Sequence, residues 1–247
     1  MTRRNKQETA KKDWWTVGII ATAVVLIVVI CAVVLIGSGV FSPDSNEPTY
    51  NINVQIEPVY EQAHQLGNGL ELVSVGKFAG IYMEDGSNQI VSNTLMIKLA
   101  NNSQKDLQFG KIVLEYPKFT AEFEATNIPA GRTVVLLEKN RREFVDERYN
   151  VATAQNLVFF SKNMTKAEDR IEISGRDGVL NVKNISAQSI TGDIYVYYKY
   201  VAGDQLYGGV TYRAKISGGL DAGAMQQVMA SHYDMDGSVI LSVVIGE

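Results

Sequence analysis

The stretch "IKLANNSQKDLQFGKIVLEY", residues 97 to 116, decides the fold because a similar stretch, "LNVKNISAQSITGDIYVYY", occupies residues 180 to 198. Each contains a strand-like run, an Asn-x-Ser turn, an aliphatic residue four positions after the serine, a glycine and a second strand-like run. In that second run, alternate residues match at a spacing of 82: Ile112 with Ile194, Leu114 with Val196 and Tyr116 with Tyr198. Alternate residues share one face of a strand, so these positions are predicted to point into a core. We therefore expect an internal repeat of two β modules, the alternative being that any two β-hairpins look this alike.

Short runs rich in β-branched and aromatic residues surround the two copies and predict a mostly β protein. They lie at residues 70–83, 94–100, 110–116, 132–138, 156–161, 170–174, 179–184, 193–200, 209–216 and 238–245. Asp-Gly pairs at 85, 177 and 236 supply turns, so the pattern favours antiparallel sandwiches. Residues 138–149 are predicted to form an exposed helical turn or two. Residues 221–233 are predicted to form either a short helix or a strand that leaves a turn at Ala222-Gly223.

The two copies resemble bacterial immunoglobulin-like modules of the FxLYD kind. The pattern of that family is an Asn-x-Ser turn, a strand of alternating aliphatics that ends in Tyr, and a later Leu or Ile before Pro-Ala-Gly. The match rests on "NNSQKDLQFGKIVLEY" with "NIPAG" and on "NISAQSITGDIYVYYK" with "GGLDAG", in which Asp221 replaces the proline. The final "QQVMASHYDMDGSVI" is similar to uncharacterised anchored envelope proteins of Gram-positive anaerobes. The resemblance implies two immunoglobulin-like sandwiches at a cell surface and transfers no catalytic residue.

A run of twenty uncharged residues, Val17 to Ile36, predicts a transmembrane helix over residues 14–37. Twenty helical residues cover about 30 Å, the thickness of the hydrocarbon core of a bilayer. Trp14 and Trp15 suit the membrane interface, where one edge of each ring stays hydrated. Two alternatives are a buried helix of a soluble protein and a cleaved signal peptide, although signal sequences have shorter apolar regions of about 7 to 15 residues.

The charges that flank this run predict its orientation. Residues 1–13 carry five basic and two acidic side chains, and such a basic tail stays in the cytoplasm. Subtracting them from the totals of 23 and 27 leaves 18 basic and 25 acidic residues, a net charge of −7, for the exported part. This acidic balance argues against a nucleic-acid partner. The only cysteine, Cys31, lies in the apolar run, and an exported part without disulfides points to a bacterial envelope.

Composition divides the rest of the chain into a linker and two domains. Residues 38–50 are rich in Gly, Ser, Pro and acidic side chains, which is typical of a linker. The repeat then predicts one β-sandwich over residues 51–148 and a second over residues 149–247.

Seven of the twelve tyrosines fall between positions 195 and 233 and form the one surface that suggests binding. If Tyr198 faces the core, its neighbours in the strand face outward or toward the other domain. The candidate binding surface is Tyr195, Tyr197, Tyr200 and Tyr207. Exposed tyrosines bind sugars and protein partners through rigid faces with a polar tip. The alternative is that these rings pack the contact between the domains or a second sheet layer.

No catalytic, metal-binding or cofactor-binding residue is predicted. The two histidines, His64 and His232, are 168 positions apart and have no zinc-ligand spacing around them. Ser231 beside His232 invites a nucleophile-and-base interpretation, but adjacent residues of a strand point to opposite faces. The sequence "DMDG" at 234–237 matches half of a calcium loop and is better explained as a turn.

The sequence therefore predicts a non-catalytic binding or scaffolding protein in a bacterial cell membrane, with its domains outside the cytoplasm. Its expected partner is another envelope protein. A module that binds cell-wall polysaccharide is the first alternative, and a cryptic hydrolase that uses His232 is the second.

Overall fold

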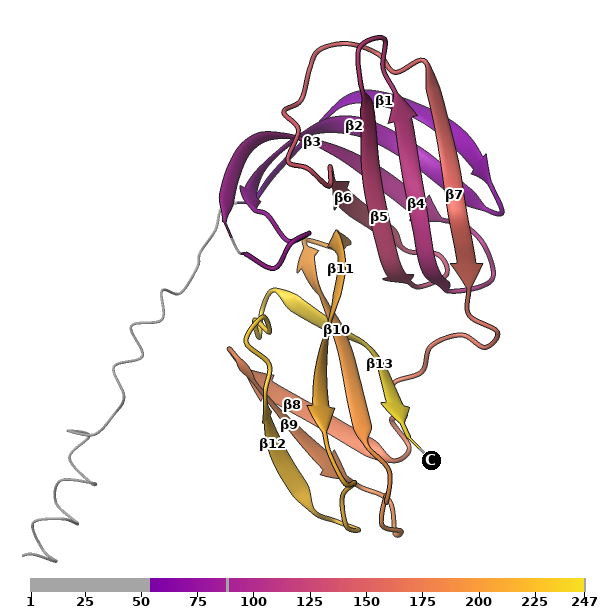
Figure 1. Cartoon of the computed structure of the whole chain (residues 1–247). Coiled ribbons are helices and arrows are strands. Elements are labelled where there is room, and N and C mark those ends of the chain that lie inside the picture. The colour runs from indigo at the N-terminus through magenta and orange to yellow at the C-terminus, as the bar shows by residue number, and fades with distance from the viewer. Residues whose placement is uncertain (1–53, 88, 247) are drawn as a thin grey trace, which may run out of the picture. The chain divides into compact units, whose positions relative to one another are not determined.

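The computed structural model describes residues 54–87 and 89–246, and in this part of the chain there are strands and no helix. The strands are β1 (Gln55–Gly67), β2 (Leu70–Ile81), β3 (Ile90–Asn101), β4 (Leu107–Glu115), β5 (Thr120–Ile128), β6 (Thr133–Leu137), β7 (Val151–Phe159), β8 (Ile171–Arg176), β9 (Val179–Asn184), β10 (Ile194–Ala202), β11 (Gln205–Ile216), β12 (Met225–Met229) and β13 (Ser238–Ile245). The expectation of a mostly β protein is confirmed (Figure 1).

The first module, β1 to β7, encloses a core between two sets of strands. Strands β1, β2, β3 and β6 lie side by side in that order, and β5, β4 and β7 form the facing sheet. Side chains alternate between core and surface, as in β5, where Ala121, Phe123 and Ala125 are buried. These three side chains pack with buried residues of the opposite set such as Ile97 and Leu136.

The second module, β8 to β13, repeats this arrangement. Strands β12, β9 and β8 form one sheet, and β11, β10 and β13 lie side by side opposite it. Its own core contains Leu180 and Val182 of β9 together with Ile194, Val196 and Tyr198 of β10. The three positions of β10 that were expected to face a core do so.

The internal repeat is confirmed by a network of hydrogen bonds around the first Asn-x-Ser turn. The amide Nδ2 of the buried Asn101 donates to the carbonyl oxygens of Lys105 and Ile128, at 2.9 and 3.0 Å. The side-chain oxygen of Asn101 is bonded as well: Ser103 Oγ donates to Asn101 Oδ1 at 2.7 Å. Asn101 also accepts from the N–H of Gly131 at 2.7 Å through its own carbonyl.

The second turn makes the same contacts. Asn184 Nδ2 donates to the carbonyls of Gln188 and Leu220, at 2.8 and 3.0 Å, and Ser186 Oγ donates to Asn184 Oδ1 at 2.7 Å. The N–H of Gly223 donates to the Asn184 carbonyl at 3.0 Å. Both closing glycines have positive φ, 72° in the first module and 75° in the second, which explains why each copy has Gly at this point.

Most of the predicted strands are confirmed, since each of the ten runs overlaps an observed strand. Strands β1 and β5 were not predicted. The helical turns predicted at 138–149 are wrong, because these residues are mostly irregular, with a turn at 139–140, a bend at 146 and an isolated bridge from Glu143 to Thr94. At 221–233 the strand alternative is confirmed by β12.

Several predictions fall on residues outside the described part. These are the cytoplasmic tail at 1–13, the membrane span at 14–37 with Trp14 and Trp15, and the linker at 38–50. Among the residues that are described, no helix has the length and apolar character needed to cross a membrane. The expected domain boundary at 148 and 149 falls just before β7, and β7 pairs with β4, so the first module runs to Phe159.

Candidate functional site

The hairpin of β10 and β11 is longer than its counterpart in the first module. The counterpart has only residues 117–118 between the stacked rings of Tyr116 and Phe119. In the second module, residues 199–211 separate the stacked rings of Tyr198 and Tyr212. We call residues 199–211 the hairpin extension.

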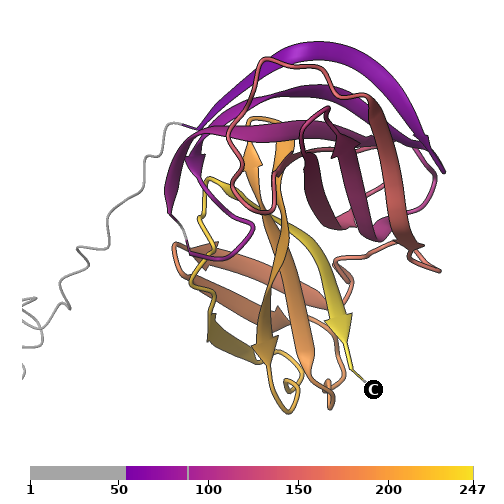
Figure 2. The same ribbon diagram turned by 45° about the horizontal axis from the view of Figure 1, so that its top comes forward.

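The hairpin extension joins the second module to the first. Leu206 and Tyr207 of β11 pair in parallel with Val134 and Val135 of β6. One seven-stranded sheet, in the order β1-β2-β3-β6-β11-β10-β13, therefore runs through both modules (Figures 1 and 2). The pairing is parallel, unlike the antiparallel pairing that the turns predict within each module. A hairpin requires antiparallel pairing, and no hairpin links β6 to β11, so the parallel direction is open to them.

Lys199 is a fully buried cation at the base of the hairpin extension, with 0% of its surface exposed. Its Nζ donates to the carbonyl oxygens of Gly208, Gly209 and Val210 at 2.8, 2.9 and 2.6 Å. Three acceptors match the three hydrogens of an ammonium group. Burial lowers the pKa of Lys199 to about 7, and the charge of Glu84 opposes that shift. The lysine therefore ties the returning strand of the extension to its outgoing strand.

Glu84 contacts the other side of the same peptide segment. Both carboxylate oxygens accept from the N–H of Gly209, at 2.9 and 2.8 Å, and one also accepts from the N–H of Leu137 in β6 at 3.0 Å. Burial raises the pKa of Glu84. Because Lys199 binds the carbonyl of Gly209 and Glu84 binds its N–H, this glycine is held from both modules.

Gly209 is a glycine because the first module approaches it closely. A Cβ at this position would lie 1.8 Å from the carbonyl oxygen of Glu124 in β5. The hydroxyl of Thr126 in the same strand donates to the Gly209 carbonyl at 2.6 Å. Gly209 thus serves the contact between the modules.

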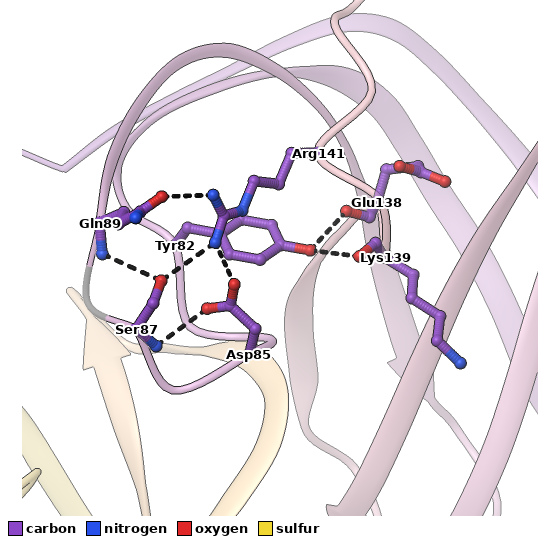
Figure 3. A network of polar contacts seen from close by, with 7 residues as sticks. All are labelled: Tyr82, Asp85, Ser87, Gln89, Glu138, Lys139 and Arg141. Carbon is purple, nitrogen blue, oxygen red and sulfur yellow. Dashed lines mark hydrogen bonds and ion pairs between the residues drawn. The ribbon is translucent and has the colours of Figure 1, made fainter.

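The loop that carries Glu84 is fixed by the polar network in Figure 3. The Tyr82 hydroxyl points at the carbonyl oxygens of Glu138 and Lys139, 2.9 and 2.7 Å away. The guanidinium of Arg141 lies 4.8 Å over the centre of the Tyr82 ring. Arg141 also contacts three polar side chains of the loop: Asp85, Ser87 and Gln89. This network attaches residues 82–87 and Gln89 to the segment that follows β6.

Two of the four candidate tyrosines belong to the contact between the modules. Tyr207 is 4% exposed and packs against Phe78 of β2, with ring centroids 6.0 Å apart. Tyr200 packs on Tyr207 at 5.7 Å, and burial raises the pKa of Tyr200 to about 12. For these two rings the structure agrees with the packing alternative.

Tyr195 and Tyr197 are partly exposed on the outer face of β10. The Tyr195 ring lies 5.1 Å from the guanidinium carbon of Arg213 and 5.5 Å from Lys215 Nζ, and its hydroxyl donates to Asp193 at 3.2 Å. Its ring face is thus already covered by cations of β11. Of the four tyrosines, Tyr197 lines a pocket.

The pocket beside Tyr197 has a volume of about 350 Å³. Its lining comes from both modules and from the segment between them: Gln108, Asn127, Phe160, Lys162, Asn163, Met164, Thr165, Tyr197, Ser242, Val243 and Val244. The side chain of Asn163 already has hydrogen-bond partners, since it donates to the carbonyl of Gln104 and accepts from the N–H of Asp106. Among the described residues, the side chains of Gln108 and Asn127 have no hydrogen-bond partner, so two amides are available to a ligand.

Ser231 and His232 do contact each other, and the prediction that they could not is wrong. Ser231 Oγ lies 3.2 Å from His232 Nδ1, because these residues are in a turn and not in a strand. The His232 ring stacks on Tyr212 with centroids 4.4 Å apart. Within the described residues no carboxylate bonds to the second ring nitrogen, so the group that orients the base in a triad is missing.

Residues 234–237 form a turn, as predicted. Asp234 Oδ1 accepts from the N–H groups of Asp236 and Gly237 at 2.9 and 2.8 Å. In the part of the chain that the structure describes, no three His, Cys, Asp or Glu side chains are grouped to hold a metal ion.

In comparisons with known proteins, the chain matches no family model, no curated protein and no solved structure. The resemblance to FxLYD-type modules therefore stays a prediction. Sequence reasoning missed Lys199 and Glu84, and the available signal was a lysine inside the aromatic run "YVYYKY" at 195–200.

Proposed function

We propose that this protein is a non-catalytic binding or scaffolding protein of a bacterial envelope. In this proposal a single amino-terminal helix anchors it with its amino terminus in the cytoplasm, and two immunoglobulin-like sandwiches present a binding site outside. The anchor raises the effective concentration of this site for neighbours in the same membrane. The basic tail, the apolar run and the repeated β modules support the proposal.

The pocket beside Tyr197 is the observation that carries the binding role. It combines an aromatic ring, aliphatic side chains of β13 and two unpartnered amides. Sites that bind and orient a ligand have this composition, and no catalytic group is needed for it. Because the hairpin extension attaches one module to the other, residues from both modules keep fixed positions around it. Such a preformed site loses little entropy on binding.

A protein segment is the occupant we favour for this pocket. Phe160, Met164 and Val244 offer apolar contact, and Lys162 is the charged residue of the lining. This arrangement suits an apolar side chain that lies next to a carboxylate of the partner. A volume of about 350 Å³ fits one or two side chains of a protein and leaves the rest of the contact to the surrounding surface.

Photo-cross-linking of the full-length protein in its native membrane tests this role. We would introduce a benzophenone amino acid at Tyr197 and, as a control, at the exposed Gln155 of β7. The expected result is one dominant protein attached through position 197 and absent at position 155. The same products at both positions, or none at 197, would refute a protein partner at this pocket.

A polysaccharide is the second candidate, favoured by the position of Tyr197 next to Gln108 and Asn127. Aromatic rings pack on sugar faces, and amides bond to hydroxyls. The full-length protein would then sediment with purified cell wall, and Tyr197→Ala would lower the bound fraction about tenfold. Tyr195→Ala is the matched control, because Tyr195 lies outside the pocket; equal losses for both variants would exclude sugar binding at this pocket.

A further inference from the structure

The outer edge of β6 and the outer edge of β12 are equivalent positions in the two modules, and among the described residues only the edge of β6 is paired. In the first module, β11 pairs with Val134 and Val135, and Glu84 accepts from the N–H of Leu137. By the repeat, β12 follows its closing turn as β6 does, and it pairs with β9 as β6 pairs with β3. In the described part of the chain, no strand lies on the other side of β12 (Figure 1).

The hydrogen bonds to β9 show which residues of β12 face this open edge. The carbonyl of Ala224 accepts from the N–H of Asn184, and the N–H of Ala230 donates to the carbonyl of Gly178. Inward and outward backbone groups alternate along an antiparallel strand. The N–H and C=O groups of Met225, Gln227 and Met229 therefore point away from β9, and among the described residues they have no partner.

The side chains of β12 do nothing to protect this edge. Exposed edge strands are normally blunted by lysine, proline or inward-pointing charges. The strand reads Met-Gln-Gln-Val-Met and contains neither a charge nor a proline. Met225 and Met229 are 64% and 74% exposed, among the most exposed large apolar side chains described.

We propose that β12 pairs with β12 of a second copy of this chain, antiparallel, around a twofold axis through Gln227. In this register Met225 lies opposite Met229 of the partner, and Gln227 lies opposite its own equivalent. The strand is thus self-complementary, as a twofold interface requires, and no like charges meet. Three outward residues on each strand exchange six backbone hydrogen bonds, and the sheets β8-β9-β12 of the two copies become one six-stranded sheet.

Charge substitutions at Met225 and Met229 test both the interface and its register, and they do not depend on the role of the Tyr197 pocket. We would measure the dimer dissociation constant of the full-length protein in mild detergent by sedimentation velocity. The variant M225K/M229K places lysine opposite lysine and is expected to weaken the dimer at least tenfold. The variant M225K/M229E places lysine opposite glutamate only if the strands are antiparallel, and it is expected to return the constant to within about threefold of the native value.

Residues 1–53 are the same in all three proteins, so association through that segment would not change between them. A native protein that stays monomeric, or equal constants for the native and double-lysine proteins, would overturn the proposal. A charge-paired variant as weak as the double-lysine variant would overturn the antiparallel register. Both methionines are mostly exposed, so the substitutions leave the fold intact, which circular dichroism melts would verify. As a second measurement, in a Cys31→Ser background, Gln227→Cys is expected to cross-link to itself, whereas Glu172→Cys on the far strand β8 is not.

Discussion

Replacing Asn184 by alanine should cost a large part of the stability of the protein. The residue is 0% exposed, and its amide supplies donors to the carbonyls of Gln188 and Leu220. Its Oδ1 also accepts from the N–H and the hydroxyl of Ser186, at 3.0 and 2.7 Å. The Leu220 carbonyl keeps the N–H of Ile190 and the Gln188 carbonyl keeps the Ser186 hydroxyl, so neither loses its last partner. The cost therefore comes from the four lost hydrogen bonds of the Asn184 side chain, each of which contributes about 0.5–1.5 kcal/mol.

We therefore expect Asn184→Ala to lower the free energy of unfolding by about 3 kcal/mol. For a unit of this size, 1 kcal/mol shifts the melting temperature by about 2–4 °C, so the expected loss is about 6–12 °C. The assay is urea and thermal unfolding of the full-length protein in mild detergent, followed by near-ultraviolet circular dichroism. Asn102→Ala is the matched control, because within the described residues the side chain of this exposed asparagine donates only to Glu71 Oε2, at 2.8 Å.

Asn101→Ala provides the stricter comparison, because its network in the first module has the same partners at nearly the same distances. The two buried asparagines should therefore give losses of similar size. If Asn184→Ala cost no more than Asn102→Ala, the hydrogen-bond reasoning would be refuted. If only one of the two buried positions were sensitive, the energetic equivalence of the two turns would be refuted.

Three further predictions concern the contact between the modules. Between pH 7 and 9 the free energy of unfolding of the native protein should rise relative to that of Lys199→Met, by at most about 1.4 kcal/mol per pH unit. Burial lowers the pKa of Lys199, so the unfolded chain binds more protons than the folded protein in this window. Urea-derived stability curves that run parallel for the two proteins would contradict this. Gly209→Ala should lower the free energy of unfolding by about 3 kcal/mol, because the added Cβ would meet the Glu124 carbonyl. Gly203→Ala should cost only about 1–2 kcal/mol, for its positive φ, because no atom lies within 4 Å of a Cβ there. Thermal melts that rank the two variants equally would be evidence against the close approach at Gly209. Tyr82→Phe should lower the free energy of unfolding by about 1–2 kcal/mol, because the hydroxyl loses its contacts to two carbonyls. It should also speed hydrogen–deuterium exchange of residues 83–89. Unchanged exchange there would mean that the hydroxyl does not hold the loop.

The strands that could be predicted are those whose side chains alternate strongly and have high β propensity, such as β10 with Ile194 and Val196. Strand β5 was missed because Ala121, Ala125 and two glutamates favour helix by intrinsic propensity, and packing overrides that preference. Strand β1 was missed because it is a polar edge strand that contains Pro58 and three register shifts. Patterns inside one module can be read from sequence, whereas the pairing of an edge strand depends on its neighbour.

The buried site at Lys199 could not be predicted for a related reason. Alternation along β10 places Tyr198 in the core of the second module and therefore assigns Lys199 to the outside. That outer face is covered by the first module, which local sequence does not reveal. The same limit applies to Tyr207, expected at a surface and found 4% exposed, and to Ser231 with His232, where a turn replaced the expected strand.

The hairpin extension changes how mechanical load passes through this protein. Residues 199–211 stand where the first module has a two-residue hairpin connection, and with these eleven additional residues one sheet continues through both modules. In a string of modules joined by linkers, tension straightens the linkers before it strains any fold. Here a pull on one module reaches the other through the peptide groups of β6 and β11, the Lys199 ammonium and the Glu84 carboxylate. The pair should therefore behave under force as one stiff element that yields in a single step.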